Sequence, residues 1–381
     1  MRKAIFTCSH DWNSPIQIGD HHLARGLAKR GWEVAFLSTP ISPLHFFSNA
    51  PLLRRLDNYR TDGTQDGNVW HYVPGALIVP HHKLRSLSSS WLYHNWHRLT
   101  APSLTNTLIK RGFGNVDLIC IRDAKYHFLL DKISYKHSVY RLADRDDGFD
   151  HYNSPFAEIE KKVCSTVDTV LYTAHSLRGY AITRGARDPR HFPHGVDWLR
   201  FANSKAPQPV EYSQLSKPIA VYVGSIEGWF NYELIANAAT RLPDISFVII
   251  GPLHQKNLFS DIPNIHVLGP RSYEEIPAYL SWADVGLIPF STGPQYKKLV
   301  DGINPIKLYE YFAAGLPVIS ATWDEIKHIN SPALLYRTEE EFINLLQIFD
   351  RSTEHKNNLR NYAEGLDWAN RVAELESLLI P

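Results

Sequence analysis

Short apolar runs of strand length alternate with segments of helical periodicity along most of the chain. The runs cover residues 3–8, 33–38, 116–121, 138–142 and 169–172, then 219–223, 247–250, 265–268, 285–288 and 318–319. Apolar positions at helical spacing predict helices near 18–30, 231–241, 273–282, 305–314 and, less regularly, 90–111. A strand, a helix and a second strand within the first forty residues form a βαβ unit, so the pattern predicts parallel sheets.

The alternation occurs twice and predicts an α/β protein with two doubly wound, Rossmann-like domains facing a cleft. A chain of 381 residues is also too long for one comfortable core. A proline-containing stretch at 200–217 has the composition of a linker. We therefore predict an N-terminal domain at 1–205, a C-terminal domain at 206–360 and a terminal helix at 361–381.

The stretch from Ile303 to Ile319 has the signals of a complete short helix. Asn304 suits the N-cap, Pro305 suits the first helical position, and Gly315 provides a stop. Lys307 falls in the first turn, where a cation opposes the helix dipole, and this predicts an anion beside it. Glu310 lies one turn further on the same face, where it could accept hydrogen bonds from sugar hydroxyls. A solvent-facing Lys–Glu pair is the alternative.

Two polar loops follow predicted strands at the edge where open α/β sheets bind ligands. The first contains Ser9, His10 and Asp11, and the second runs from Ala143 to Asp147. The first strand is not followed by a Gly-x-Gly-x-x-Gly motif, which argues against a dehydrogenase-type dinucleotide site.

Charge is distributed unevenly between the halves. Residues 1–200 hold 26 Lys and Arg against 18 Asp and Glu, and the remainder holds 14 against 21. Residues 67–116 contain no acidic residue; their aromatic and basic side chains include Trp70, Tyr72, Trp91, Tyr93, Trp96 and Phe113 with Lys83, Arg85, Arg98, Lys110 and Arg111. This combination favours anionic headgroups at a membrane surface, or nucleic acid. A solvated basic face over an aromatic core is the alternative.

The cysteines predict neither a disulfide framework nor a zinc site. Cys8, Cys120 and Cys164 are odd in number and lie far apart. The first residues lack the apolar region of a signal peptide, and no apolar run is long enough to span a bilayer. We expect a cytoplasmic protein.

Four segments resemble the donor-binding half of GT-B glycosyltransferases. They are Val223–Glu227, Asp284–Pro289, Asn304–Tyr311 and Ala314–Val318. The N-terminal half matches more thinly: Ser9-His10-Asp11 with Pro15, Tyr140-Arg141 with Asp144, and His194-Gly195-Val196-Asp197 are similar to the xanthan-type glucuronosyltransferase and its teichuronic-acid relatives.

The resemblance implies a donor site in the C-terminal half. Lys307 and the amides around Pro305 and Ile306 would neutralise the donor diphosphate, and Glu310 would hold the ribose. The Gly224-Ser225 turn would approach the phosphates through its backbone. His194 would donate to the same charge, unless it is a cap or core histidine. His10 and Asp11 would lie on the acceptor side.

The resemblance also implies that Asp144 is the general base of an inverting reaction. The alternative is that one of Asp144, Asp146 and Asp147 caps the next helix. Retaining relatives carry an acidic residue eight positions before the ribose glutamate; here that position is Gly302, which weakens a retaining assignment. Asp144 and Asp146 also resemble the metal-binding Asp-x-Asp of GT-A enzymes, but Lys307 and a helix terminus would supply the same charge, so we expect no metal.

Together these features predict a glycosyltransferase that moves a sugar from a nucleotide-diphosphate donor, UDP-linked, to a lipid-linked saccharide in polysaccharide or cell-wall polymer synthesis. It would act at the inner face of the cell membrane and bind no nucleic acid. The alternatives are a retaining glycosyltransferase, a nucleotide-sugar epimerase or phosphorylase with the same domains, a nucleic-acid-binding protein and a noncatalytic scaffold.

Overall fold

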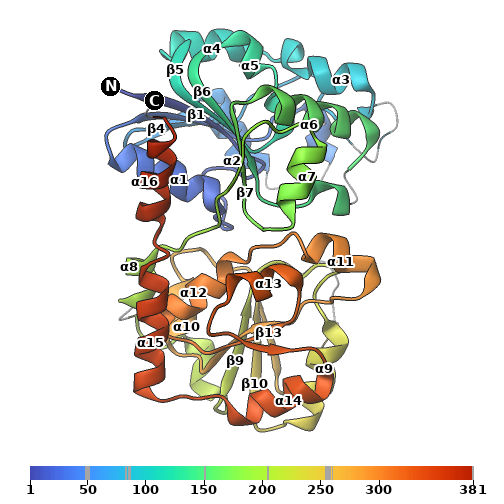
Figure 1. Cartoon of the computed structure of the whole chain (residues 1–381), viewed down its shortest axis with the longest axis vertical. Helices are drawn as coiled ribbons and strands as arrows, with labels where there is room; N and C mark the ends of the chain where they lie inside the picture. The colour runs from blue at the N-terminus through green and yellow to red at the C-terminus, as the bar shows by residue number, and fades with distance from the viewer. Residues whose placement is uncertain are drawn as a thin grey trace. The chain divides into compact units, whose positions relative to one another are not determined.

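The computed structural model divides into two compact units, shown in Figure 1. It describes residues 1–47, 52–81, 84, 87–149, 152–203, 206–253, 259 and 261–379. The first unit comprises Met1–Pro193 and Arg371–Pro381, and the second comprises His194–Asn370. The division at residue 193 precedes the boundary that the sequence predicts at residue 205.

The first unit is built on a sheet with the strand order β3-β4-β2-β1-β5-β6-β7-β8. All neighbouring strands are parallel except β3 and β4. The strand order reverses between β1 and β5, which is where doubly wound sheets bind ligands. The strands are β1 (Lys3–Thr7), β2 (Glu33–Leu37), β3 (Thr64–Asp66), β4 (Val69–Tyr72), β5 (Asn115–Ile121), β6 (Ser134–Leu142), β7 (Thr169–Tyr172) and β8 (Pro189–His191).

Helices connect these strands. The α-helices are α1 (Gly19–Lys29), α2 (Leu52–Arg60), α3 (Ser90–Asn95), α4 (Leu104–Lys110), α5 (Leu129–Lys132), α6 (Ser154–Thr166) and α7 (Leu177–Thr183). Short 3-10 helices are η1 (Pro43–Phe47), η3 (Trp96–Leu99), η4 (Ala124–Tyr126) and η5 (Asp146–Gly148).

The second unit has a wholly parallel sheet in the order β11-β10-β9-β12-β13-β14. This is the Rossmann order, with the reversal between β9 and β12. The strands are β9 (Ile219–Val223), β10 (Ser246–Ile250), β11 (Ile265–Gly269), β12 (Val285–Ile288), β13 (Val318–Ala321) and β14 (Leu334–Tyr336). The prediction of two doubly wound α/β sheets is confirmed.

Helices of the second unit pack in two groups. Helices α8, α10, α12 and α15 contact one another, while α9 and α14 form a second pair. The helices are α8 (Trp198–Ala202), η6 (Val210–Gln214), α9 (Tyr232–Arg241), α10 (Ile276–Ser281), α11 (Pro294–Val300), α12 (Ile306–Ala314), α13 (Asp324–Ile329), α14 (Glu339–Ile348) and α15 (Thr353–Glu364). The last helix, α16 (Trp368–Ser377), begins in the second unit, and from Arg371 onward it belongs to the first.

Some predicted elements differ from the structure. The predicted helix at 90–111 is wrong, because α3 and α4 are separate helices with Pro102 in the segment between them. The predicted linker at 200–217 contains the end of α8 and all of η6. The short strand β3 escaped prediction because its three residues are all exposed and polar, so they carry no apolar signal.

The aromatic residues of the basic stretch are mostly core. Five of the six have exposed fractions of 5% or less: Trp70, Tyr72, Tyr93, Trp96 and Phe113. They therefore fit the aromatic-core alternative, and their interpretation as a surface for headgroups or nucleic acid is wrong. Trp91 is the exception, with an exposed fraction of 62%. The basic side chains Arg98, Lys110 and Arg111 are exposed, whereas Lys83 and Arg85 lie outside the described residues.

Within the described ranges, no helix is both long enough and apolar enough to cross a bilayer.

Candidate functional site

Helix α12 begins beside the residues that follow β9, at the strand-order reversal of the second sheet. Pro305 is its N-cap residue, and Gly315 ends it in the left-handed conformation with φ of 80°. The predicted stop is therefore confirmed. The prediction that Asn304 is the N-cap is wrong, because α12 starts one residue later, at Ile306. The first N–H groups of such a helix lack intrahelical acceptors and favour an anion.

Asn304 instead connects buried polar groups. Its Oδ1 accepts from the His194 main-chain N–H at 3.3 Å and from the Tyr309 hydroxyl at 3.0 Å. Its Nδ2 donates to Glu325 Oε1 at 3.0 Å. Both Asn304 and Glu325 are buried, and a buried polar group without a hydrogen bond destabilises the folded state, so these bonds stabilise the fold. They also hold the His194 backbone at the start of α12.

Lys307 and Gly224, which the resemblance places at a phosphate site, lie close together. The Lys307 amine donates to the Tyr222 hydroxyl at 3.1 Å. Gly224 has φ of 146°, and a Cβ atom there would stand 2.6 Å from Lys307 Nζ. A side chain at this position would displace the Lys307 amine, and the backbone conformation itself favours glycine. Ser225 is next in the turn, and its carbonyl accepts from the Tyr222 hydroxyl at 2.7 Å.

The charge of Lys307 has no paired anion among the described residues. Burial lowers the pKa of its amine to about 7, although Glu310 acts in the opposite direction. No carboxylate in the described part of the chain lies within 4.0 Å of the amine. A bound anion would restore the charged form, since an opposite charge nearby favours it.

Glu310 is buried one turn along α12, with an exposed fraction of 8%. Burial raises its pKa to about 7, and Asp197 also raises it, while Lys307 and a hydrogen bond from Tyr273 lower it. In the free protein, burial therefore favours the neutral form of both Lys307 and Glu310. A ligand with an anionic group for the amine and hydroxyls for the carboxylate would satisfy both.

A second glycine, which the sequence analysis missed, supports the Gly224 turn. Gly251 follows the neighbouring strand β10 and has φ of 152°. A Cβ atom there would lie 1.9 Å from the Gly224 carbonyl oxygen. The Gly224 N–H also donates to the Ile250 carbonyl at 2.9 Å. A glycine directly after a predicted strand was the signal that could have identified it.

Tyr311 fixes α12 against the end of β9. Its hydroxyl accepts from the Val223 main-chain N–H at 2.8 Å, one residue before Gly224. Gly286 of β12 makes room for its ring, because a Cβ atom there would stand 2.4 Å from a ring carbon. Tyr311 was also missed, since a tyrosine in an apolar helix resembles ordinary core.

The His194 main-chain N–H donates to Asn304, and this hydrogen bond holds the residue beside the start of α12. Its side chain is buried, and its ring packs edge-on against Trp368 with centroids 6.0 Å apart. The structure thus brings together His194, Gly224, Lys307 and the start of α12 within one unit. That the His194 ring donates to a phosphate remains a prediction.

Asp144 follows β6 in the first unit. Arg122, which follows the adjacent strand β5, donates to its carboxylate at 2.7 Å. The Asp144 side chain keeps 35% of its surface exposed. Burial opposes the charge of Arg122, but Asp144, Asp146 and Asp20 raise its pKa, so the guanidinium stays charged.

The other two aspartates of this loop differ in their surroundings. Asp146 is 5% exposed, and burial raises its pKa to about 7 against the lowering effect of Arg122. Asp147 pairs with Arg145 at 2.9 Å. Neither caps the helix that follows, because the N-cap of α6 is Asn153, which accepts from Phe156 N at 2.9 Å. The helix-cap alternative for these aspartates is therefore wrong.

His10 and Asp11 follow β1, on the other side of β5 from β6. Asp11 pairs with Arg55 at 3.0 Å. Burial and then Arg122 lower the pKa of His10, whereas Asp11 and Asp144 raise it. His10 thus lies within electrostatic reach of Asp144 and Arg122, as strand ends at one sheet edge predict.

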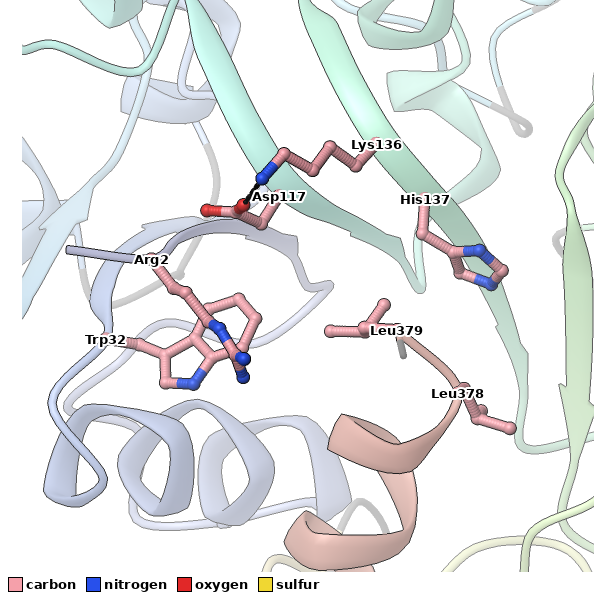
Figure 2. Close-up of a pocket in the computed structure, with 7 residues that line it drawn as sticks. All are labelled: Arg2, Trp32, Asp117, Lys136, His137, Leu378 and Leu379. Carbon is pink, nitrogen blue, oxygen red and sulfur yellow. Dashed lines mark ion pairs between the residues drawn. The ribbon is translucent and has the colours of Figure 1, made fainter. Parts of the chain in front are cut away.

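A cavity of about 350 Å³ lies at the end of the first sheet opposite the loops that contain His10 and Asp144 (Figure 2). Its polar lining is largely paired internally: Lys136 bonds Asp117 at 2.7 Å, and the Arg2 guanidinium lies over the Trp32 ring, 5.5 Å from its centroid. Leu379 closes it from the C-terminal segment. It lies beside the amino ends of β1, β5 and β6, away from the predicted site residues.

Both halves of the chain match known families. Residues 6–173 match the family described as "Glucuronosyltransferase GumK, N-terminal domain", and residues 217–347 match "Glycosyl transferases group 1". A curated relative is the "Putative teichuronic acid biosynthesis glycosyltransferase TuaH" of Bacillus subtilis (strain 168), with 24% identity over 225 residues. This match covers 55% of the chain and only 56% of that relative, so it spans about half the length of each.

Solved structures share the fold at low identity. Sucrose-phosphate synthase from Thermosynechococcus elongatus has a TM-score of 0.71 and 16% identity, covering 99% of this chain and 98% of that one. HepE of Anabaena, in complex with UDP and glucose, has a TM-score of 0.69 and 13% identity, covering 100% and 99%. The structure described as "Trehalose-6-phosphate from E. coli bound with UDP-2-fluoro glucose" has a TM-score of 0.69 and 11% identity, covering 99% and 98%.

Proposed function

Since the chain is a glycosyltransferase of the GT-B fold, with a family match in each half, we propose that it transfers a sugar from a UDP-sugar donor to a lipid-linked saccharide acceptor. The reaction would extend a polysaccharide or a cell-wall polymer at the inner face of the cell membrane. TuaH, which matches part of the chain, is described as a "Putative teichuronic acid biosynthesis glycosyltransferase", and this supports the proposed polymer product.

The observation that carries the proposal is the Lys307 amine beside Gly224. It is a half-buried cation without a paired carboxylate in the described part of the chain, next to the amino end of α12. A donor diphosphate supplies the missing charge, and Glu310 accepts the ribose hydroxyls. As the sugar leaves, negative charge grows on the diphosphate, so the same groups favour the transition state.

UDP is the proposed nucleotide because several structures of similar fold contain it. HepE of Anabaena was solved with UDP and with UDP-glucose. Fold similarity at 13% identity does not extend to the sugar, so we propose the nucleotide alone.

Asp144 is the proposed general base. Its carboxylate takes the proton of the acceptor hydroxyl while the oxygen attacks the anomeric carbon, and UDP leaves from the opposite face with inversion. A retaining reaction is less well supported. The position expected to be acidic is Gly302, and the neighbouring Asp301 binds the Lys297 amine at 2.6 Å.

The membrane surface is proposed from exposed apolar groups in the basic part of the first unit. Trp91 and Leu77 have exposed fractions of 62% and 63%, and Leu84 has 48%. Arg98, which is close to Trp91 in the sequence, is also exposed. Such side chains suit the boundary between headgroups and lipid tails, where a lipid-linked acceptor would be met.

Calorimetric titration of the protein with UDP, GDP and ADP, each with and without EDTA, tests the donor site. We expect UDP to bind most tightly and to bind equally well in EDTA, because Lys307 and α12 neutralise the diphosphate without a metal. Loss of binding in EDTA would instead require a metal. No binding of any nucleotide would refute the donor site.

A polynucleotide titration on the same sample distinguishes the nucleic-acid alternative. Binding that weakens steeply with salt, in a protein that binds no nucleotide diphosphate, would favour that alternative. A sample that binds UDP but transfers sugar to no lipid-linked saccharide would correspond to the scaffold alternative.

A further inference from the structure

Tyr222 lies in β9 at the point where the predicted donor groups meet. Its side chain is 1% exposed. Its hydroxyl accepts from Lys307 Nζ at 3.1 Å and donates to the Ser225 carbonyl at 2.7 Å. One buried hydroxyl therefore joins a lysine on α12 to the turn after β9, although these groups are far apart in the sequence.

The ring of Tyr222 restrains the same amine. Lys307 Nζ lies 4.3 Å from the Tyr222 ring centroid and 5.0 Å from that of Phe290. Phe230 packs edge-on against the Tyr222 ring with centroids 4.8 Å apart, which fixes the ring. Two aromatic faces and one hydroxyl thus hold the amine in place, and the missing Cβ of Gly224 leaves its space open.

We propose that the Tyr222 hydroxyl is a positioning group of the donor site, which fixes the Lys307 amine against the Gly224-Ser225 turn before the nucleotide binds. The inference rests on the proposed function and adds a residue to it. A flexible lysine that is already fixed loses less freedom on binding, so the arrangement raises donor affinity without touching the sugar.

The test compares two tyrosine-to-phenylalanine variants of the full chain. Tyr222→Phe keeps the ring and removes both hydrogen bonds. Tyr212→Phe is the matched control, because Tyr212 is also 1% exposed in the same unit and its hydroxyl has no hydrogen-bond partner in the described structure. Calorimetry with UDP gives the dissociation constant, and the thermal unfolding midpoint of each variant shows whether it is folded.

We expect Tyr222→Phe to raise the UDP dissociation constant roughly three- to tenfold and Tyr212→Phe to leave it unchanged. In a Lys307→Met background the effect of Tyr222→Phe should shrink, since a group that acts through the amine has little left to position. This loss of effect separates positioning from a general loss of packing.

Three results would overturn the inference. Wild-type affinity in Tyr222→Phe would do so while leaving the donor site intact. An equal, additive effect in the Lys307→Met background would show that Tyr222 acts independently of Lys307. Failure of the wild-type protein to bind UDP would refute the donor site and this role together.

Discussion

Arg122 donates to Asp144 at 2.7 Å, yet the Asp144 carboxylate keeps 35% of its side-chain surface exposed. The contact orients one oxygen and leaves the carboxylate accessible, as a general base requires. We predict that Asp144→Asn preserves the UDP dissociation constant and lowers kcat by at least about a hundredfold, since the amide cannot take a proton. Initial rates of transfer, with calorimetry of UDP binding, measure both effects.

Asp147→Asn is the matched control on the same loop, because Asp147 is already paired with Arg145. It should keep most of its turnover. Full turnover in Asp144→Asn would exclude this residue as the base. Asp146, whose pKa burial raises to about 7, would then be the next candidate, followed by Asp11.

Lys307→Met should weaken donor binding without weakening the fold. The substitution keeps an unbranched apolar side chain between the rings of Tyr222 and Phe290 and removes the charge that burial disfavours. A charge-assisted contact is worth about 1.5–3 kcal/mol, so the UDP dissociation constant should rise roughly ten- to a hundredfold. Calorimetry and the thermal midpoint are the two measurements.

Lys327→Ala serves as a surface control, because Lys327 pairs with Asp324 on α13 at 2.7 Å. Its UDP affinity should match that of the wild type. A Lys307→Met protein with normal affinity would remove Lys307 from the site.

Donor binding should take up a proton at mildly alkaline pH. Burial lowers the pKa of free Lys307 to about 7, so the amine is mostly neutral at pH 8, and a bound diphosphate raises that pKa. The contribution of Lys307 to affinity is therefore full below pH 7 and falls as pH rises from 7 to the pKa of the complex, by up to about tenfold per unit. Calorimetry at pH 8 in two buffers of different ionisation enthalpy counts the proton.

Glu310 contributes little to this count, because burial raises its pKa only to about 7 and it is largely ionised at pH 8. Lys307→Met should abolish the proton uptake. Uptake that persists in this variant would come from another group.

Gly251→Ala should disturb both the fold and the donor turn. A Cβ atom there would lie 1.9 Å from the Gly224 carbonyl oxygen, a backbone atom that cannot rotate away. We expect the free energy of unfolding to fall by about 2–4 kcal/mol, with weaker UDP binding. Gly269→Ala is the control: its φ is 72°, but its Cβ would meet nothing within 4 Å, so only about 1 kcal/mol of backbone strain applies. Equal losses in the two variants would contradict the steric explanation, and urea unfolding measures them.

The sequence predicted the elements that carry a strong apolar signal. Strands β9 and β12 have the predicted bounds, and Gly315 ends α12 as expected. The meeting of Lys307 and Gly224 could also be anticipated, because the resemblance to GT-B glycosyltransferases implies that both approach the donor phosphates. Alternation of strands and helices is a local property, and local sequence records it.

The remaining features depend on tertiary contacts. Asn304 resembles an N-cap in sequence, but its amide is needed by His194 and Glu325, which lie far away along the chain. Asp144 and Asp146 are equivalent in sequence, but Asp146 is buried, whereas Asp144 is half-buried and accepts a hydrogen bond from Arg122. Tyr222 in an apolar strand is indistinguishable from core until Lys307 is placed beside it. Pairings across a fold leave no periodic pattern, so single-sequence reasoning could not find them.

The Val223 main-chain N–H donates to the Tyr311 hydroxyl on α12 and not to a neighbouring strand. The exchange of this amide hydrogen with deuterium therefore reports the docking of α12 on β9, and not the opening of the sheet. The amide adjoins Gly224, so slower exchange in the presence of a nucleotide would reflect a tighter hold of α12 on that turn. One backbone position thus offers an intrinsic probe of the local dynamics of this site.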